Sequence, residues 1–223
     1  MATTLKFDNL NVLDSKAVKK SDLKQKPLAK PYREYFGVMF IEPEEMRSRI
    51  ELAEEIEDVM LWVFAYWIVA AEAEISKEEL KQDAKDKLIS VIAQHTKLDP
   101  YLEKHIDDVI NEVVDTTEKH AEETDTDYWL SQDRAMLIAE NEANAFENYV
   151  DYRDARESGK TKKVWLTELD DKVRPTHEIA EGQTVDIDGL FLVGDSLMRF
   201  PMDTEYDADP SETVNCRCVC KYE

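Results

Sequence analysis

The stretch from residue 42 to residue 75 constrains the fold more than any other part of the chain. It reads EPEEMRSRIELAEEIEDVMLWVFAYWIVAAEAEI. Its first turns are acidic, which suits the positive end of a helix dipole. Its second half is apolar on every side, which is typical of a helix surrounded by other helices. The apolar run, residues 60–71, is too short to cross a bilayer, so we predict a central helix buried in protein.

Three further helical segments follow, each with a recognisable start or stop. The sequence SKEE at residues 76–79 forms a capping box, in which Ser76 caps and Glu79 reaches back. Asp99 followed by Pro100 predicts the next helix start. A fourth helical pattern runs from about residue 133 to residue 157, and Gly159 is placed to end it. Residues 40–159 are therefore predicted to form an antiparallel bundle of about four helices.

After residue 159 the pattern changes to that of short strands. KKVWLTEL alternates roughly, and QTVDIDGLFLVGDSLMRFP is broken by Asp188-Gly189 and Gly194-Asp195 turns. PMDTEYDADPSET is expected to be an acidic loop, and VNCRCVCKY a last strand. We therefore predict a small antiparallel β unit over residues 160–223 and an α+β fold for the whole chain.

The N-terminal part has a different composition. Residues 1–35 hold eight Lys or Arg against four Asp or Glu, and Pro27 and Pro31 oppose regular structure. We predict an extended basic arm over residues 1–39. Such an arm is either a mobile tail or lies along a neighbouring subunit.

The formal net charge of −22 disfavours broad nucleic-acid binding by the folded part, because most of its surface repels phosphate. Only local DNA contact through the arm is compatible with this charge. The start of the chain lacks a signal-peptide pattern, and no membrane contact is expected. These features are typical of a cytosolic protein or of one inside a particle assembled in the cytosol. The arm lysines available for DNA are Lys19, Lys20, Lys24, Lys26 and Lys30.

The three cysteines all lie near the C-terminal end of the sequence. If CRCVC is a strand, Cys216, Cys218 and Cys220 face the same side. Structural zinc takes four ligands, and His177 is the only other nearby candidate. Three interpretations stay open: buried core cysteines, a zinc site at His177, Cys216 and Cys218, or a redox or nucleophilic role. We favour core cysteines, because cysteine often behaves as a small hydrophobe.

His177 could act as a general base only with a nucleophile and an orienting carboxylate beside it. Asp170, Asp171 and Glu178 are near in sequence, but we favour a histidine hydrogen-bonded across the turn after Pro175. The sequence contains no phosphate-binding or nucleophile-elbow motif. We therefore predict no catalytic residue and no cofactor, and expect no enzyme. Arg174 and Arg217 are expected to pair with carboxylates of the acidic β unit.

A combination of motifs in the last two-fifths of the chain carries a family resemblance. The helix RAMLIAENEANAFENYVDYRDARESG precedes W-x-T-x-x-D-D-x-V-R-x-x-H, a glycine five residues later, P-x-D and N-C-R-C. This order resembles the phage head-morphogenesis family, the Mu F-like minor head proteins, over about residues 130–220. The residues that match the motif and are expected to form its framework are Asp171, Val173, Arg174, His177, Gly182, Asn215, Cys216, Arg217 and Cys218.

The resemblance implies a minor capsid or portal-associated protein of a tailed bacteriophage. Such a protein would dock on portal or major capsid subunits during head assembly in the host cytoplasm, stay in the virion, and in some relatives travel with the DNA. Many relatives carry C-x-x-C where this chain has residues 173–176, and a terminal H-x-x-C-x-C, a set that would complete a zinc site. Here the first pair is V-R-P-T, so no zinc is expected. Relatives fused to toxin domains suggest the alternative, a metal-dependent hydrolase or toxin-like module using His177 and the cysteines.

Overall fold

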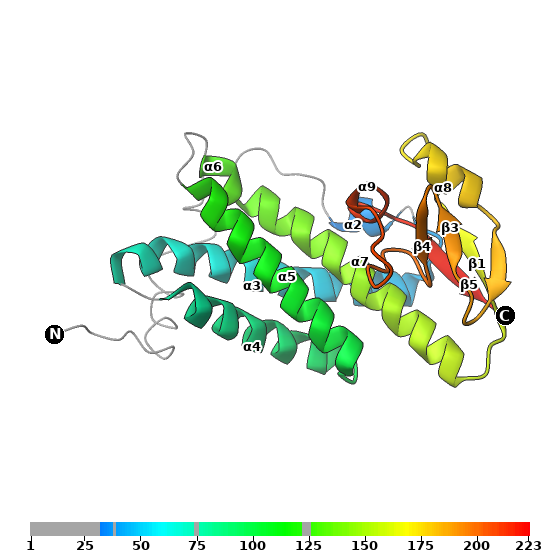
Figure 1. The fold of residues 1–223 in the computed structure, drawn as a ribbon, viewed down its shortest axis with the longest axis horizontal. Coiled ribbons are helices and arrows are strands. Elements are labelled where there is room, and N and C mark those ends of the chain that lie inside the picture. The colour runs from blue at the N-terminus through cyan, green and yellow to red at the C-terminus, as the bar shows by residue number, and fades with distance from the viewer. Residues whose placement is uncertain (1–31, 38, 74–75, 122–125) are drawn as a thin grey trace. The chain divides into compact units, whose positions relative to one another are not determined.

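The computed structural model describes residues 32–37, 39–73, 76–121 and 126–223 (Figure 1). Residues 1–31 of the predicted basic arm, including its lysines, lie outside the described residues. The remaining arm residues differ from an extended chain. They include helix α2 (Tyr32–Phe36), in which Tyr35 and Phe36 are buried. Burial of these two aromatic rings offsets the cost of ordering a short helix after a proline.

The four predicted helices are confirmed as α3 (Pro43–Ala73), α4 (Lys77–His95), α5 (Pro100–Ala121) and α7 (Gln132–Glu157). Their ends follow the expected capping. The Ser76 hydroxyl accepts the backbone N–H of Glu79 at 3.1 Å, and the Asp99 carboxylate accepts that of Tyr101 at 3.0 Å. Gly159 follows α7 with a φ of 82°. A short helix, α6 (Thr126–Trp129), was not predicted.

The apolar second half of α3 is only partly buried, whereas a helix surrounded on every side was predicted; residues 61, 65, 67 and 69 are half-buried. Met60, Val63 and Phe64 are fully buried, whereas the side chain of Ile68 is 47% exposed. No helix among the described residues is both long and apolar enough to cross a membrane.

Ion pairs show that α4 and α5 run antiparallel. Lys85, near the middle of α4, pairs with Asp107 at 2.8 Å, while Lys77, at its start, pairs with Asp115, which lies later in α5, at 2.8 Å. The short connection between the two helices allows this arrangement.

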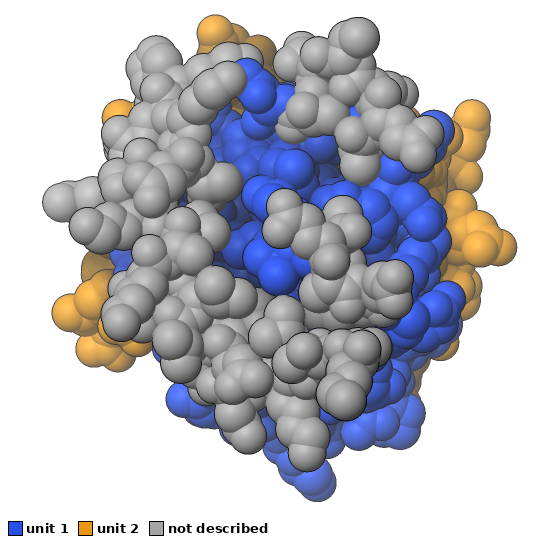
Figure 2. Space-filling view, turned by 90° about the vertical axis from the view of Figure 1, so that its left-hand side faces the viewer, with its two compact units in different colours: residues 1–29, 54–139 blue, residues 30–53, 140–223 orange. Residues whose placement is uncertain are grey.

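The chain divides into two compact units, coloured separately in Figure 2. Unit 1 holds the described residues of Glu54–Ala139, and unit 2 holds those of Lys30–Ala53 together with Glu140–Glu223. These limits are not the predicted boundaries at residues 39 and 159. The three-part division of the chain stays a prediction.

Unit 2 contains two small antiparallel sheets (Figure 1). The first has the order β2-β1-β5, with β1 (Lys162–Leu166) between β2 (Thr184–Asp186) and β5 (Val219–Tyr222). The second is a hairpin of β3 (Phe191–Val193) and β4 (Ser196–Met198), which turns at the predicted Gly194-Asp195. Two short helices lie where turns and an acidic loop were expected, α8 (Pro175–Ala180) and α9 (Pro210–Thr213).

The core of unit 2 forms around Trp165 of β1, whose side chain is fully buried. Aliphatic, aromatic and sulfur-containing side chains surround it. They are Ala145, Ala180, Phe191, Val193, Met198, Met202, Cys216 and Cys218.

The last strand is shorter than predicted, and this changes the positions of the cysteines. It begins at Val219, so Cys216 and Cys218 lie in the preceding loop rather than on one face of a strand. Asn215, with a φ of 57°, turns the chain before this loop. Cys216 and Cys218 are buried and Cys220 is half-buried.

Candidate functional site: a buried histidine and cysteine cluster

Helix α8 positions His177 inside unit 2. Pro175 occupies the first position of the helix, where its fixed φ is favourable and its missing N–H is no loss. Gly182 follows the helix with a φ of 71°, and its N–H donates to the carbonyl of Trp165 at 2.9 Å. This bond joins the end of α8 to β1. As a result, the His177 side chain is only 2% exposed.

The two ring nitrogens of His177 have different partners. Nδ1 lies 3.3 Å from Sγ of Cys218 and 3.7 Å from Sγ of Cys216. Nε2 lies 3.0 Å from Oε2 of Glu212. A carboxylate can only accept, so Nε2 carries a hydrogen and Nδ1 faces the sulfur atoms. The cluster is thus a carboxylate, an imidazole and two thiols in that order.

Side chains distant in sequence hold the backbone of the cysteine loop. The carbonyl of Cys216 accepts from the Tyr35 hydroxyl at 3.1 Å and from the Asn144 side chain at 2.8 Å. The carbonyl of Cys218 accepts from Asn148 at 3.2 Å. These carbonyls have no strand partner, so the three side chains satisfy groups that would otherwise be buried without hydrogen bonds.

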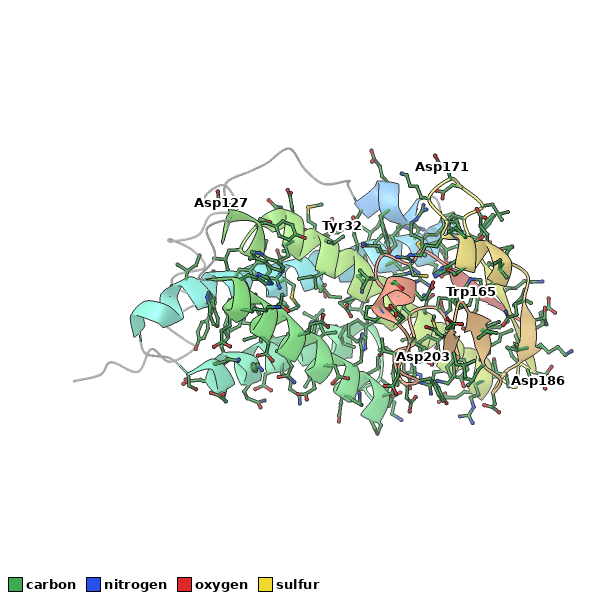
Figure 3. All side chains as sticks on the ribbon, turned by 45° about the horizontal axis from the view of Figure 1, so that its top comes forward. Tyr32, Asp127, Trp165, Asp171, Asp186 and Asp203 are labelled. Carbon is green, nitrogen blue, oxygen red and sulfur yellow. The ribbon has the colours of Figure 1, made fainter. Side chains whose placement is uncertain are left out.

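Trp165, labelled in Figure 3, packs against the imidazole. Its ring centroid is 5.8 Å from that of His177, and the two planes meet at 83°. Phe191 also packs edge-on against this indole, with the two ring centroids 5.3 Å apart. This aromatic contact restricts rotation of the His177 ring and excludes water from it.

The surroundings shift the pKa values of the two thiols in opposite directions. The hydrogen bond to Cys218 lowers the pKa of Cys216, and His177 lowers it further. The hydrogen bond to Cys216 and burial raise the pKa of Cys218 far above the usual value. Burial lowers the pKa of His177, but the hydrogen bond and charge of Cys216 outweigh this, so it lies above its ordinary value. These opposite shifts favour negative charge on Cys216 over negative charge on Cys218.

A thiol, an imidazole and a carboxylate in this order are the parts of a nucleophilic centre. The carboxylate is that of Glu212. The three acids near His177 in sequence do not supply it, because Asp170 pairs with Arg217, while Asp171 and Glu178 are exposed. Cys216 is 1% and Cys218 4% exposed. A substrate could not reach either sulfur without opening the core of unit 2.

His177, Cys216 and Cys218 also have the chemistry of zinc ligands. Their ligand atoms lie within 4.8 Å of one another. Among the described residues, this is the one cluster of His, Cys, Asp or Glu side chains spaced closely enough to hold a metal ion. Structural zinc takes four protein ligands, and a catalytic zinc has three together with an accessible position. Glu212 already faces the opposite ring nitrogen and cannot complete the set there. This closed, three-ligand set does not fit a zinc site.

The other predicted framework residues lie around the cluster. Arg217 makes two hydrogen bonds to Asp170, at 2.7 and 2.8 Å, and holds the pKa of that carboxyl at about 2. Arg174 donates to the carbonyl of Val214, whereas a carboxylate partner was expected. This bond ties the start of α8 to the chain just before the cysteine loop.

The remaining predicted residues shape turns. Asp171 is exposed, and Val173 is half-buried in the turn before α8, where its N–H donates to the carbonyl of Asp170 at 3.2 Å. The N–H of Asn215 donates to the side chain of Asn141 at 2.8 Å. Sequence reasoning missed Glu212 and Tyr35. Glu212 lies in the stretch expected to be an acidic loop, and no local sequence pattern pointed to it.

The comparisons with known proteins agree with the motif. The family described as "Phage Mu protein F like protein" matches residues 102–221, more than half of the chain. An NAD(+)–arginine ADP-ribosyltransferase, EFV of Enterococcus faecalis, is 33% identical over 102 residues, which are 44% of this chain. The chain spans only 20% of that relative's length. No solved structure matches. The chain therefore belongs to the Phage Mu protein F like family, which supports a role in phage head morphogenesis.

Proposed function

We propose that this chain is a structural minor head protein that docks on portal or major capsid subunits while the phage head assembles. Membership of the family, which rests on residues 102–221, carries the proposal. The same stretch contains residues 140–221 of unit 2 but not its first part, residues 30–53. We propose that it remains in the virion and that the basic arm contacts a partner subunit or, locally, DNA.

We further propose that the chain is not an enzyme. Support comes from the burial of the one thiol, imidazole and carboxylate cluster described above, whose sulfur atoms are almost completely covered. The ADP-ribosyltransferase activity belongs to a relative of which this chain covers a fifth, so that activity is not proposed here.

Fractionation of assembled particles tests the structural role. We expect the chain to be found by mass spectrometry in purified heads, at few copies relative to the major capsid protein, and to be retained by immobilised portal or capsid subunits. Imaging of heads that carry a tagged chain should then show density at the portal vertex. Heads that lack the chain, together with failure to bind either subunit, would refute the proposal.

A Cys216→Ser variant separates the structural role from the enzymatic alternative, because Cys216 is the thiol with the lowered pKa. Serine keeps the approximate size and a hydrogen-bond donor but removes a thiol that a nucleophilic or metal-dependent mechanism requires. We expect heads to assemble normally, provided that the variant is folded by circular dichroism. Loss of assembly by a folded variant would favour chemistry at the cluster.

A further inference from the structure

The carboxylate of Glu212 occupies a small site formed by Thr176, His177 and Gly194, here called the carboxylate site. It lies on the single-turn helix α9, which begins at the N-cap Asp209, and its side chain is only 12% exposed. Oε2 accepts from the Thr176 hydroxyl at 2.7 Å and faces Nε2 of His177 at 3.0 Å. One carboxylate oxygen of Glu212 therefore contacts two adjacent residues of α8.

The third residue of the carboxylate site is Gly194, in the turn between β3 and β4. A Cβ added to Gly194 would lie 2.7 Å from Oε1 of Glu212 and 3.3 Å from its Cδ. Real Cβ atoms do not approach other atoms so closely, so any larger residue at this position must displace the carboxylate. Gly194 also has a φ of 59°, which favours glycine. The hairpin turn thus leaves space for the carboxylate.

The position of Glu212 determines what His177 presents to the sulfur atoms. In metal centres, a carboxylate on one imidazole nitrogen commonly orients the other nitrogen toward the metal ion. Here the same arrangement directs Nδ1 at two thiols that already lie within hydrogen-bond range. The cluster therefore contains the carboxylate–histidine pair of such a metal centre, but among the described residues it lacks a fourth one that could bind the metal ion.

We propose that Glu212 takes over the organising role of a metal ion: by holding His177 against Cys216 and Cys218, it lets this cluster form and stay closed in a metal-free chain. The inference concerns the internal organisation of unit 2 and does not depend on the proposed role in the head. Glu212 acts here as a positioning residue, because it reaches the thiols only through the imidazole.

Metal content is the first test. Protein purified without chelators should contain far less than one zinc per chain, and a strong chelator should leave the Tm unchanged. Added Co²⁺ should produce no visible absorption of the kind that thiolate ligands give. Near-stoichiometric zinc, a chelator-dependent fall in Tm or a thiolate–Co²⁺ spectrum would each overturn the proposal.

Thiol accessibility in the folded protein is the second test. Glu212→Gln keeps the shape but removes the charge, and hydrogen bonds to charged groups are stronger than those between neutral groups. We expect Cys216 and Cys218 to react with a thiol reagent at least about tenfold faster in this variant. Glu178→Gln, an exposed change on α8, is the control and should react at the wild-type rate. Equal rates in both variants would overturn the proposal.

A glycine pair provides a test that leaves Glu212 itself in place. Gly194→Ala adds a Cβ that clashes with the carboxylate, whereas a Cβ at Gly182, which also has positive φ, meets nothing within 4 Å. Both variants carry the same kind of backbone strain. We expect Gly194→Ala to speed thiol labelling well beyond Gly182→Ala when the two are compared under conditions of equal global stability. Equal labelling rates in the two variants would show that the carboxylate site does not determine how accessible Cys216 and Cys218 are.

Discussion

Lys163 is a buried cation that should cost the protein stability, and replacing it with methionine tests this. The side chain is fully buried, and its Nζ has no hydrogen-bond partner. Burial lowers the pKa of Lys163 to about 8, against the opposing effects of Cys220, Asp203 and Asp188; Arg199 lowers it further. Methionine has a similar volume and no charge, so it should fit the same space.

The pKa shift sets the size of the effect. A fall from 10.5 to about 8 corresponds to about 3 kcal/mol between the charged and neutral forms. The ammonium also lies over the rings of Tyr152, at 4.7 Å, and Phe191, at 5.3 Å, and these contacts return about 1–2 kcal/mol. We therefore expect Lys163→Met to raise the free energy of unfolding at pH 7 by about 1–2 kcal/mol.

The pH dependence has a definite sign. Above pH 10.5 the lysine is neutral in both states, so burial costs nothing through this group. Between pH 10.5 and about 8 the unfolded chain binds the proton while the folded chain does not, so stability falls as pH falls. Below about pH 8 both states are charged and the full cost remains. The advantage of the methionine variant should therefore shrink as pH rises from 8 to 10.

Urea unfolding of both proteins at pH 7 and pH 9.5 measures these differences. Lys162→Met changes the neighbouring, exposed lysine of β1 and should have little effect at either pH. If Lys163→Met destabilises the protein, or if its effect is the same at both pH values, the buried ammonium is not the cause and the reasoning is wrong.

Other variants test the loop and turn contacts by the same urea assay. Gly182→Ala should cost about 1–2 kcal/mol, because its φ of 71° disfavours a side chain although the space is open; an unchanged midpoint would contradict this. Asn144→Ala should cost about 2–3 kcal/mol, because it removes the bond to the Cys216 carbonyl and leaves buried groups unpaired. Arg217→Lys should cost about 0.5–1 kcal/mol, because lysine cannot make both bonds to Asp170; a cost near zero would mean that the pair is not formed in solution.

The helices of this protein were predictable because local patterns specify them. Capping by Ser76 and Asp99, and the termination at Gly159, depend on neighbours within a few residues. The strand β1 and the Gly194-Asp195 hairpin turn were predictable for the same reason.

The candidate site depended on contacts that sequence patterns do not carry. The Tyr35 hydroxyl reaches a carbonyl 181 residues away, and Glu212 reaches His177 across 35 residues. Glu212 looked like one acid among many in an acidic loop, since nothing local distinguishes a buried carboxylate from an exposed one. Strand alternation also misplaced the cysteines, because side chains, rather than a strand partner, satisfy the Cys216 and Cys218 carbonyls.

The discontinuity of unit 2 has a consequence for synthesis on the ribosome. Residues 30–53 emerge before the contiguous stretch 54–139, and their partners in unit 2 begin only at residue 140. At 5–20 residues per second, those early residues wait on the order of ten seconds until β5 emerges and pairs with β1. Throughout that interval Tyr35 and Phe36 have no finished core to enter. A chaperone that binds exposed aromatic residues should therefore associate with nascent chains arrested near residue 200 and leave once β5 has emerged.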